Sequence, residues 1–419
     1  MPPLGYAALS FMEQQELIPH LFRTEYRKIV SVLCKRFGFG QVELAEDITS
    51  ETFVTAAQTW GIKGIPSNPV AWLYNVAKNK AKNYLHRELL FLDKIVTEVR
   101  KNSMEGYEFE IDLSPQNISD SQLQMMFAIC NPSIAPEAQV GLSLRILCGF
   151  GIDEIAEAFL SNKETINKRL FRAKERLREG NTKIELPTPA EIDERLDVVL
   201  TTIYLLFSEG YYSVNKNQTI CKDLCLEAMR LCYMLIEHNN TNKPHVNALM
   251  ALMCFHTSRF DARTGINGEH ILYDEQDISL WNADLISRGG YFLNRAATGE
   301  RLTKYHLEAA IAFWSTQQAD TEEKWENVLQ LYNRLLQIEY SPVAALNRTF
   351  ALSKTNGKHE AIIAAEKLNL TGNHFYFTLL GELYTGIDNR KARLNFEKAI
   401  SIAKNQPDKQ SIQKKIDCL

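Results

Sequence analysis

Apolar residues recur at spacings of three and four along most of the chain, which predicts an all-α protein. The pattern is sharpest between Ile152 and Arg178, where a break at 160–162 separates two short amphipathic stretches. Two short helices joined by so tight a turn predict a helix-turn-helix. Ser161 and Glu164 fit a capping box for the second helix, and Asn162 is the alternative cap.

The outer face of this second helix is basic and polar. Asn, Thr and Arg near a helix start can reach base edges in a major groove, while Lys and Arg also suit phosphates. The ordinary alternative is a solvated helix in a bundle, but turn, cap and basic bias coincide here and favour nucleic-acid binding. The candidate residues are Lys163, Thr165, Asn167, Lys168, Arg169 and Arg172.

Three helices are expected before this motif, over 17–37, 42–60 and 70–87, with a Gly/Pro loop over 61–69. The second of them has an apolar side that includes Phe53. Its other side is acidic, which indicates either a solvated face or a face that docks on a basic partner. The acidic residues are Glu43, Glu46, Asp47 and Glu51.

The third helix is basic, and no acidic residue occurs between Gly61 and Arg87. Basic groups interleaved with amides and aromatic rings are suited to backbone phosphates and unstacked bases. An ordinary surface helix is the alternative. The candidate residues in the loop and helix are Lys63, Asn68, Trp72, Asn75, Lys78, Asn79, Lys80, Lys82 and Arg87.

The second half of the chain is expected to be helical throughout and to end in repeats. Short helices in pairs, with small residues at matching positions, resemble tetratricopeptide repeats, which stack into concave surfaces for peptides or proteins. The expected repeat helices are 305–316, 322–338, 342–355, 358–368, 374–385 and 390–404. The predicted domains are 11–90, an acidic linker over 91–120, the helix-turn-helix domain over 121–183, a helical extension over 190–300 and repeats over 301–405.

Composition narrows the function classes. The net charge of −4 confines nucleic-acid affinity to local patches. Neither a signal peptide nor a membrane-spanning run is recognisable, so a cytoplasmic protein without membrane contact is expected. The eight cysteines form no CxxC pair, and buried reduced thiols are expected rather than a metal site. Phosphate-binding loops and zinc-protease helices are also missing, so the sequence predicts neither an enzyme nor a cofactor.

Several motifs together resemble a known family. They are Ala45-Glu46-Asp47-Ile48 with Glu51-Thr52-Phe53, then Pro69-Val70-Ala71-Trp72-Leu73 with Val76-Ala77-Lys78-Asn79, and finally Glu154-Ile155-Ala156 with Thr165-Ile166 and Arg169-Leu170-Phe171-Arg172. In this order, over residues 11–182, they resemble the extracytoplasmic-function class of bacterial RNA polymerase sigma factors. The remaining chain resembles a subgroup with a C-terminal tetratricopeptide-like helical extension.

The resemblance implies two sigma domains, core RNA polymerase and promoter DNA as partners, and a protein or peptide partner for the repeats. It implies that Glu46, Asp47, Glu51 and Phe53 dock on the clamp helices of the polymerase. The basic loop and helix residues named above would hold the minus-ten element, with a flipped base in the 62–68 loop. The outer face of the helix-turn-helix would read the minus-thirty-five element in the major groove.

Two other functions are weighed against a sigma factor. A DNA-binding regulator with a repeat domain would need no polymerase-docking face, so the acidic pair Asp47 and Glu51 argues against it. An adaptor with a vestigial helix-turn-helix would not keep the undiluted basic face at Lys168, Arg169 and Arg172. The sequence therefore predicts a sigma factor that directs promoter-specific initiation, with an extension that regulates activity or recruits a partner.

Overall fold

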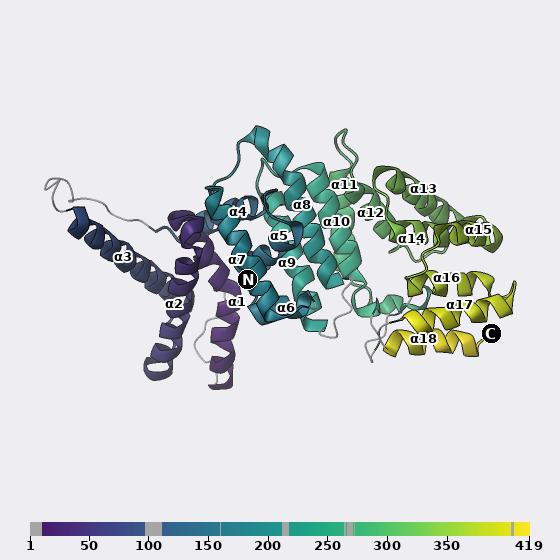
Figure 1. Cartoon of the computed structure of the whole chain (residues 1–419), viewed down its shortest axis with the longest axis horizontal. Coiled ribbons are helices and arrows are strands. Elements are labelled where there is room, and N and C mark those ends of the chain that lie inside the picture. The colour runs from purple at the N-terminus through teal and green to yellow at the C-terminus, as the bar shows by residue number, and fades with distance from the viewer. Residues whose placement is uncertain are drawn as a thin grey trace. The chain divides into compact units, whose positions relative to one another are not determined.

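The computed structural model describes residues 11–96, 111–159, 161–211, 218–263, 265, 271, 273–403 and 406–419. Helices are the only regular secondary structure over these ranges, which confirms the all-α prediction. The chain forms two compact units, Met1–Leu206 and Phe207–Leu419 (Figure 1).

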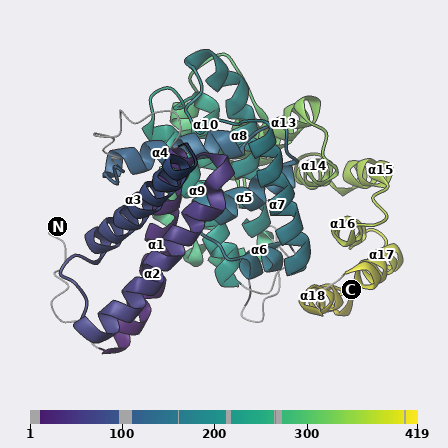
Figure 2. The ribbon, with the colours of Figure 1, turned by 60° about the vertical axis from the view of Figure 1, so that its left-hand side comes forward.

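The first unit begins with three long helices, α1 (Phe11–Phe37), α2 (Val42–Lys63) and α3 (Pro69–Val96), which lie together in Figure 2. Their apolar faces meet in a core that includes Tyr26, Ile29 and Leu33. Gly38 has a φ of 80°, a backbone conformation that favours glycine, and the chain turns there at the end of α1. Two predicted ends are wrong: α2 continues three residues into the expected loop, and α3 continues past Arg87 into the expected linker.

The helix-turn-helix part of this unit contains α4 (Pro115–Ile129), α5 (Pro136–Leu142), a π-helical turn at Ser143–Cys148, α6 (Ile152–Ala158) and α7 (Lys163–Glu179). Helix α4 begins six residues before the expected start of this domain at 121, because Ser114 caps it and Pro115 suits the first helical position. Asn162, and not Ser161, caps α7: its Oδ1 accepts from the backbone N–H of Thr165 at 2.8 Å. The capping-box prediction is therefore wrong, and the alternative cap is the one used.

Helix α8 (Pro189–Tyr211) follows directly after the short proline-containing segment at 186–188. The boundary between the two compact units falls inside this helix, after Leu206, and not near residue 190. Two contacts attach α8 to the helix-turn-helix part. Arg195 donates to the carbonyl oxygen of Phe127, and the hydroxyl of Thr202 donates to Oε1 of Gln139 at 2.8 Å.

After the end of α8, the second unit continues with α9 (Gln218–Glu237), α10 (Pro244–Ser258), α11 (Ala283–Ala296) and α12 (Lys304–Trp314). Nearly every side chain of α10 is buried. A Cβ on Gly289 of α11 would come within 2.6 Å of the Phe255 ring, so this glycine allows the close approach of α10 and α11. Short 3-10 turns at Asp261–Arg263, Tyr273–Glu275 (η4) and Ile278–Leu280 (η5) lie between them in sequence.

The repeats follow as α13 (Glu322–Ile338), α14 (Pro342–Thr355), α15 (Lys358–Leu368), α16 (His374–Tyr384) and α17 (Asn389–Ile402). The sequence predicted these helices within two residues at each end, since each starts at a capping residue or glycine. It missed α18 (Gln406–Asp417), which buries Ile412 and Ile416 against the last repeat. Consecutive helices pack on one another along the array.

The second unit is expected to lose stability below neutral pH. Burial, followed by the charges of Arg263 and Arg259, holds the pKa of His256 well below its usual value. The neutral ring packs at a tilt against the Tyr211 ring, with the ring centres 4.5 Å apart, and its Nδ1 lies 3.1 Å from the Tyr211 hydroxyl. As the pH falls, the unfolded chain takes up a proton on His256 before the folded chain does. The stabilisation by the neutral ring is therefore complete above the unfolded pKa, and below it the free energy of unfolding falls by up to about 1.4 kcal/mol per pH unit.

Thermal unfolding of the full chain between pH 7.5 and 5 tests this expectation. His256→Phe keeps the ring packing without the titration and should flatten the decline in melting temperature. His359→Phe, at an exposed position of α15, should leave it unchanged. An equal pH dependence in wild type and His256→Phe would refute the assignment.

Candidate nucleic-acid interface

Helix α2 presents its acidic residues in two different environments. Asp47 and Glu51 are exposed, and Glu51 pairs with Lys80 of α3 at 3.1 Å. Glu46 instead points toward the helix-turn-helix part, and its side chain is only 12% exposed. Phe53 is buried in the core, with its ring 5.1 Å from that of Phe22, so its predicted polymerase contact is corrected to a packing role.

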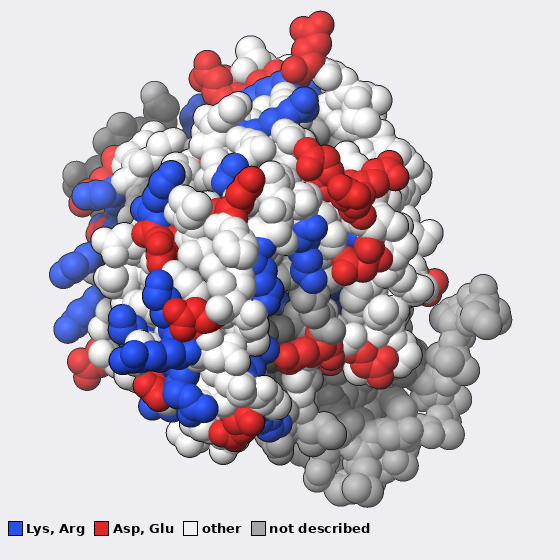
Figure 3. All heavy atoms as spheres, turned by 90° about the vertical axis from the view of Figure 1, so that its right-hand side faces the viewer, with Lys and Arg blue, Asp and Glu red and all other residues white. Residues whose placement is uncertain are grey.

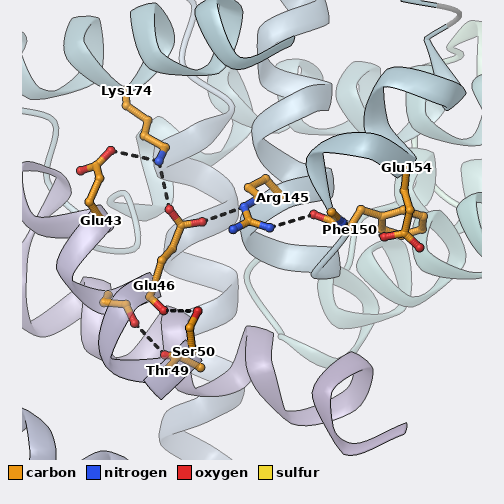
Figure 4. A network of polar contacts seen from close by, with 10 residues as sticks. Glu43, Glu46, Thr49, Ser50, Arg145, Phe150, Glu154 and Lys174 are labelled. Atoms are coloured by element: carbon orange, nitrogen blue, oxygen red, sulfur yellow. Dashed lines mark hydrogen bonds and ion pairs between the residues drawn. The ribbon is translucent and has the colours of Figure 1, made fainter. Parts of the chain in front are cut away.

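Glu46 lies at the centre of an ion-pair cluster between the two halves of the first unit (Figure 4). Its Oε1 accepts from Nε of Arg145 at 2.8 Å, and its Oε2 lies 3.1 Å from Nζ of Lys174. Lys174 also reaches Glu43 at 3.0 Å, and Arg145 donates to the Phe150 carbonyl oxygen at 3.2 Å. The cluster therefore joins α2 to both the π-helical turn and α7.

Two members of this cluster, Lys174 and Glu43, are held in their charged forms by one another and by Glu46. Burial alone would lower the pKa of Lys174, but the carboxylates of Glu46 and Glu43 outweigh it and raise that pKa. Burial would likewise raise the pKa of Glu43, but its bond to Lys174 lowers it. The lysine's contribution is lost only as the pH rises through its raised pKa, and the glutamate's only as the pH falls through its lowered pKa.

The sequence pointed to neither cation as a partner of Glu46. The position of Lys174 in the sequence fits the outer basic face of α7, because helical spacing cannot reveal that a second helix lies there. Arg145 stands alone among the apolar residues of 140–150, and a lone cation in an apolar run indicates a buried charge that needs a partner. That signal identifies the need but not the partner, which lies 99 positions away.

The predicted basic residues of α3 and its preceding loop lie mostly at the surface. Lys63, Asn75, Asn79, Lys82 and Arg87 are exposed, whereas Lys78, Lys80 and Trp72 are half-buried. Two residues also have local structural roles. Oδ1 of Asn68 accepts from the backbone N–H of Ala71 at 3.0 Å and so caps α3, and the Trp72 ring packs 5.3 Å from that of Trp60.

Lys80 and Glu51 border a shallow hollow of ≈ 400 Å³ between α2 and α3. Its lining residues are Asp47, Ser50, Glu51, Val54, Thr55 and Lys80. The exposed acidic pair of α2 and a cation of α3 thus share one open surface, where a partner's side chains could reach both.

The outer face of α7 divides into exposed and engaged residues. Thr165, Asn167, Lys168 and Arg172 are exposed. Lys163 is also exposed but pairs with Asp153 of α6 at 2.9 Å. Arg169 is half-buried, with its guanidinium 5.7 Å from the centre of the Phe159 ring. Arg169 therefore helps to join the two helices of the motif, while Lys168 and Arg172 project most freely.

The described part of the chain contains no group of three or more His, Cys, Asp or Glu side chains arranged to hold a metal ion. Six cysteines are buried, as expected, and Cys418 is exposed. Among the described helices, none is both long and apolar enough to cross a membrane.

Comparisons with known proteins identify both parts of the chain. Residues 21–89 match the model of sigma-70 region 2, and residues 195–297 match a family of unknown function, DUF6596. An uncharacterized protein of Rhizobium meliloti, R00370, is 31% identical over 396 residues, which cover 91% of each chain.

The ECF RNA polymerase sigma-E factors of Salmonella typhimurium and Escherichia coli are each 29% identical over 153 residues, covering 35% of this chain and 78% of theirs. Residues 21–89, which match sigma-70 region 2, include the acidic α2 and most of the basic α3. This chain therefore belongs to the extracytoplasmic-function RNA polymerase sigma factors, in a group that carries a large helical C-terminal extension.

Proposed function

We propose that the chain binds core RNA polymerase through the exposed face of α2 and directs promoter-specific initiation. The observation that carries this proposal is the position of Asp47 and Glu51. Both carboxylates are exposed on the helix that matches region 2, next to the basic surface of α3. Exposed like charges on one helix face are otherwise unfavourable and suit a basic partner. Glu46 would join this contact only after it leaves Arg145 and Lys174.

The DNA contacts are proposed for two helices. Helix α3, with the exposed Lys63, Asn75, Asn79, Lys82 and Arg87, would hold the melted minus-ten element through phosphate contacts and stacking. The remaining predicted contacts there are Asn68, Trp72, Lys78 and Lys80. Helix α7 would enter the major groove at the minus-thirty-five element with Thr165, Asn167, Lys168 and Arg172, flanked by Lys163 and Arg169.

The described arrangement is proposed to be a closed form. Promoter elements at minus ten and minus thirty-five lie roughly 25 base pairs apart, which is about 85 Å of duplex. Here α3 and α7 both contact α2, through Lys80–Glu51 at 3.1 Å and Lys174–Glu46 at 3.1 Å. Two DNA-reading helices on either side of a single helix cannot span that length, so the ion-pair cluster must open for both elements to be read.

The C-terminal extension is proposed to regulate this activity or to recruit a partner, in the cytoplasm and without catalysis. Its stacked helix pairs offer an extended surface of the kind that binds peptides and proteins. Transcription assays that compare the full chain with a chain ending after Tyr211 would show whether the extension inhibits or activates.

Co-elution with core RNA polymerase tests the proposed function. The double variant Asp47→Ala/Glu51→Ala should lose co-elution, because it removes both exposed carboxylates. Glu137→Ala, which removes an exposed carboxylate from α5, is the matched control and should co-elute like wild type. Equal retention of both variants would refute docking through α2 and would favour a DNA-binding regulator that does not use polymerase.

Promoter recognition should depend on Arg172 without affecting polymerase binding. A good side-chain contact to a base contributes about 1–3 kcal/mol, so Arg172→Ala should weaken specific promoter binding by roughly 5- to 150-fold. Promoter binding by the polymerase complex, compared with a scrambled site, measures this loss. Lys183→Ala removes an exposed cation beyond α7 and should change little. An equal loss in both variants would indicate nonspecific phosphate binding instead.

A further inference from the structure

A short segment, Tyr273–Trp281, lies against the repeats in the manner of a bound peptide. It contains only the 3-10 turns η4 and η5 and belongs to no helix pair. Its side chains reach α13 at the start of the repeat array and α18 at its end. Because consecutive repeat helices pack chiefly on their neighbours, one short segment can touch both ends only if the array curves around it.

Tyr273 is the aromatic anchor of this segment. Its ring packs edge-on against Trp325 of α13, with the ring centres 6.1 Å apart, in a cluster with Val328, Leu329 and Ala351. Its hydroxyl accepts from Nζ of Lys324 at 2.8 Å. Lys324 is only 2% exposed. A buried lysine that binds a hydroxyl beside a tryptophan forms a specific site for a tyrosine side chain.

Glu275 makes the second contact, at the other end of the array. Its carboxylate lies 3.0 Å from Nζ of Lys415 in α18, and Lys415 also pairs with Glu382 of α16 at 2.9 Å. Burial would lower the pKa of Lys415, but the two carboxylates outweigh it and raise that pKa. The lysine is held in place by Glu382, so it is preorganised for a second carboxylate.

The remainder of the segment is held more loosely. Gln276 accepts from Nε of Arg259 at 3.1 Å, and the Arg259 guanidinium lies 5.3 Å from the Trp281 ring centre. Ile278 and Leu280 are 42% and 51% exposed. Figure 3 faces the repeat end of the chain, where Lys and Arg side chains gather on one side, interspersed with Asp and Glu side chains.

We propose that the side of the repeats between α13 and α18 is a peptide-binding surface that its own segment Tyr273–Trp281 occupies. Its external partner is a protein segment with the same chemistry, an aromatic residue followed two positions later by a carboxylate. The aromatic ring enters the Lys324–Trp325 site and the carboxylate pairs with Lys415. The internal segment competes with this partner. The apparent affinity for the partner is therefore the intrinsic affinity multiplied by the fraction of chains whose surface is free.

Binding of a labelled peptide to the full chain tests the proposal. The probe is the nine-residue peptide YDEQDISLW, the sequence of the segment itself. The variant Tyr273→Ala/Glu275→Ala vacates the surface and should bind the peptide at least tenfold more tightly than wild type. The matched control Ile278→Ala/Leu280→Ala changes exposed positions of the same segment and should bind like wild type.

Three results separate a peptide site from a fixed part of the fold. Adding Lys415→Ala to the vacated variant should abolish the gain, and a peptide with Ala at its Tyr and third-position Glu should not bind. If Tyr273→Ala prevents folding, Glu275→Lys alone, at a half-exposed carboxylate, should still give a smaller gain. The proposal would be overturned if neither Tyr273→Ala/Glu275→Ala nor Glu275→Lys bound the peptide although both variants were folded. Equal binding by wild type and Tyr273→Ala/Glu275→Ala would also overturn it.

Discussion

A chain that ends after Glu185 is expected to be far less stable than a chain that ends after Tyr211. The first compact unit extends to Leu206, so a cut at 185 removes the whole of α8, most of which belongs to this unit. The helix carries apolar side chains that are no more than 1% exposed, at Ile192, Leu196, Val199, Leu200, Ile203 and Leu206. Burial of each such side chain stabilises the fold by about 1.5–3 kcal/mol, whereas the net free energy of unfolding of a whole domain is only about 5–15 kcal/mol.

Polar contacts add to the expected loss. Gln139 is buried, donates through Nε2 to the carbonyl oxygens of Asn131 and Ile134, and accepts from Thr202 through Oε1. Without α8 this Oε1 has lost its partner, which costs about 1–3 kcal/mol if the atom stays buried. Thermal unfolding and limited proteolysis should show no cooperative transition, or one lowered by more than roughly 10 °C, for 1–185.

The 1–211 chain is the control, because it completes α8 and removes all later helices. Equal melting of both chains would show that α8 is not needed by the first unit. The result also decides how the regulation by the extension is measured. Altered transcription from 1–185 would mix unfolding with loss of regulation, whereas 1–211 reports on the loss of the later helices alone.

Local rules explain why most helices could be predicted. Amphipathic spacing and capping residues are contained within a few positions, so α13 to α17 were predicted almost to the residue. The missed features depend on contacts between distant positions. The role of α8 comes from Arg195 and Thr202 meeting helices some 60 positions earlier, and a proline-rich segment before it resembles a linker whether or not the next helix docks.

In the candidate site, too, local features could be predicted from the sequence, whereas features that depend on distant contacts could not. Residue type and helix position predicted the exposed Asp47, Glu51, Lys168 and Arg172. The sequence did not indicate that Glu46 faces inward while Asp47, its neighbour, faces solvent, because both fit an acidic helix face. Phe53 was assigned to the interface because it belongs to a family motif, although its spacing also suits the core, where it packs on Phe22.

Reversing one charge in the ion-pair cluster should expose α2 and strengthen polymerase binding. Lys174→Glu replaces the shared cation by a third carboxylate beside Glu43 and Glu46, on a side chain that is 14% exposed in wild type. Breaking a buried ion pair costs about 3–5 kcal/mol, and this partly buried pair should cost about half of that. If the chain must open before it binds core polymerase, a closed form destabilised by about 2 kcal/mol should give roughly 30-fold tighter binding.

Lys168→Glu is the matched control, since it makes the same charge change on the exposed face of the same helix. Both variants are compared by titration with core polymerase in the absence of DNA, so the loss of DNA contacts does not enter. A spin-label distance between α2 and α7 reports opening separately. Tighter binding with a longer distance in Lys174→Glu alone supports the closed form as a masked state. A longer distance with unchanged affinity would mean that the polymerase binds the face of Asp47 and Glu51 without needing Glu46, and the ion-pair cluster would then control only the access of α3 and α7 to DNA.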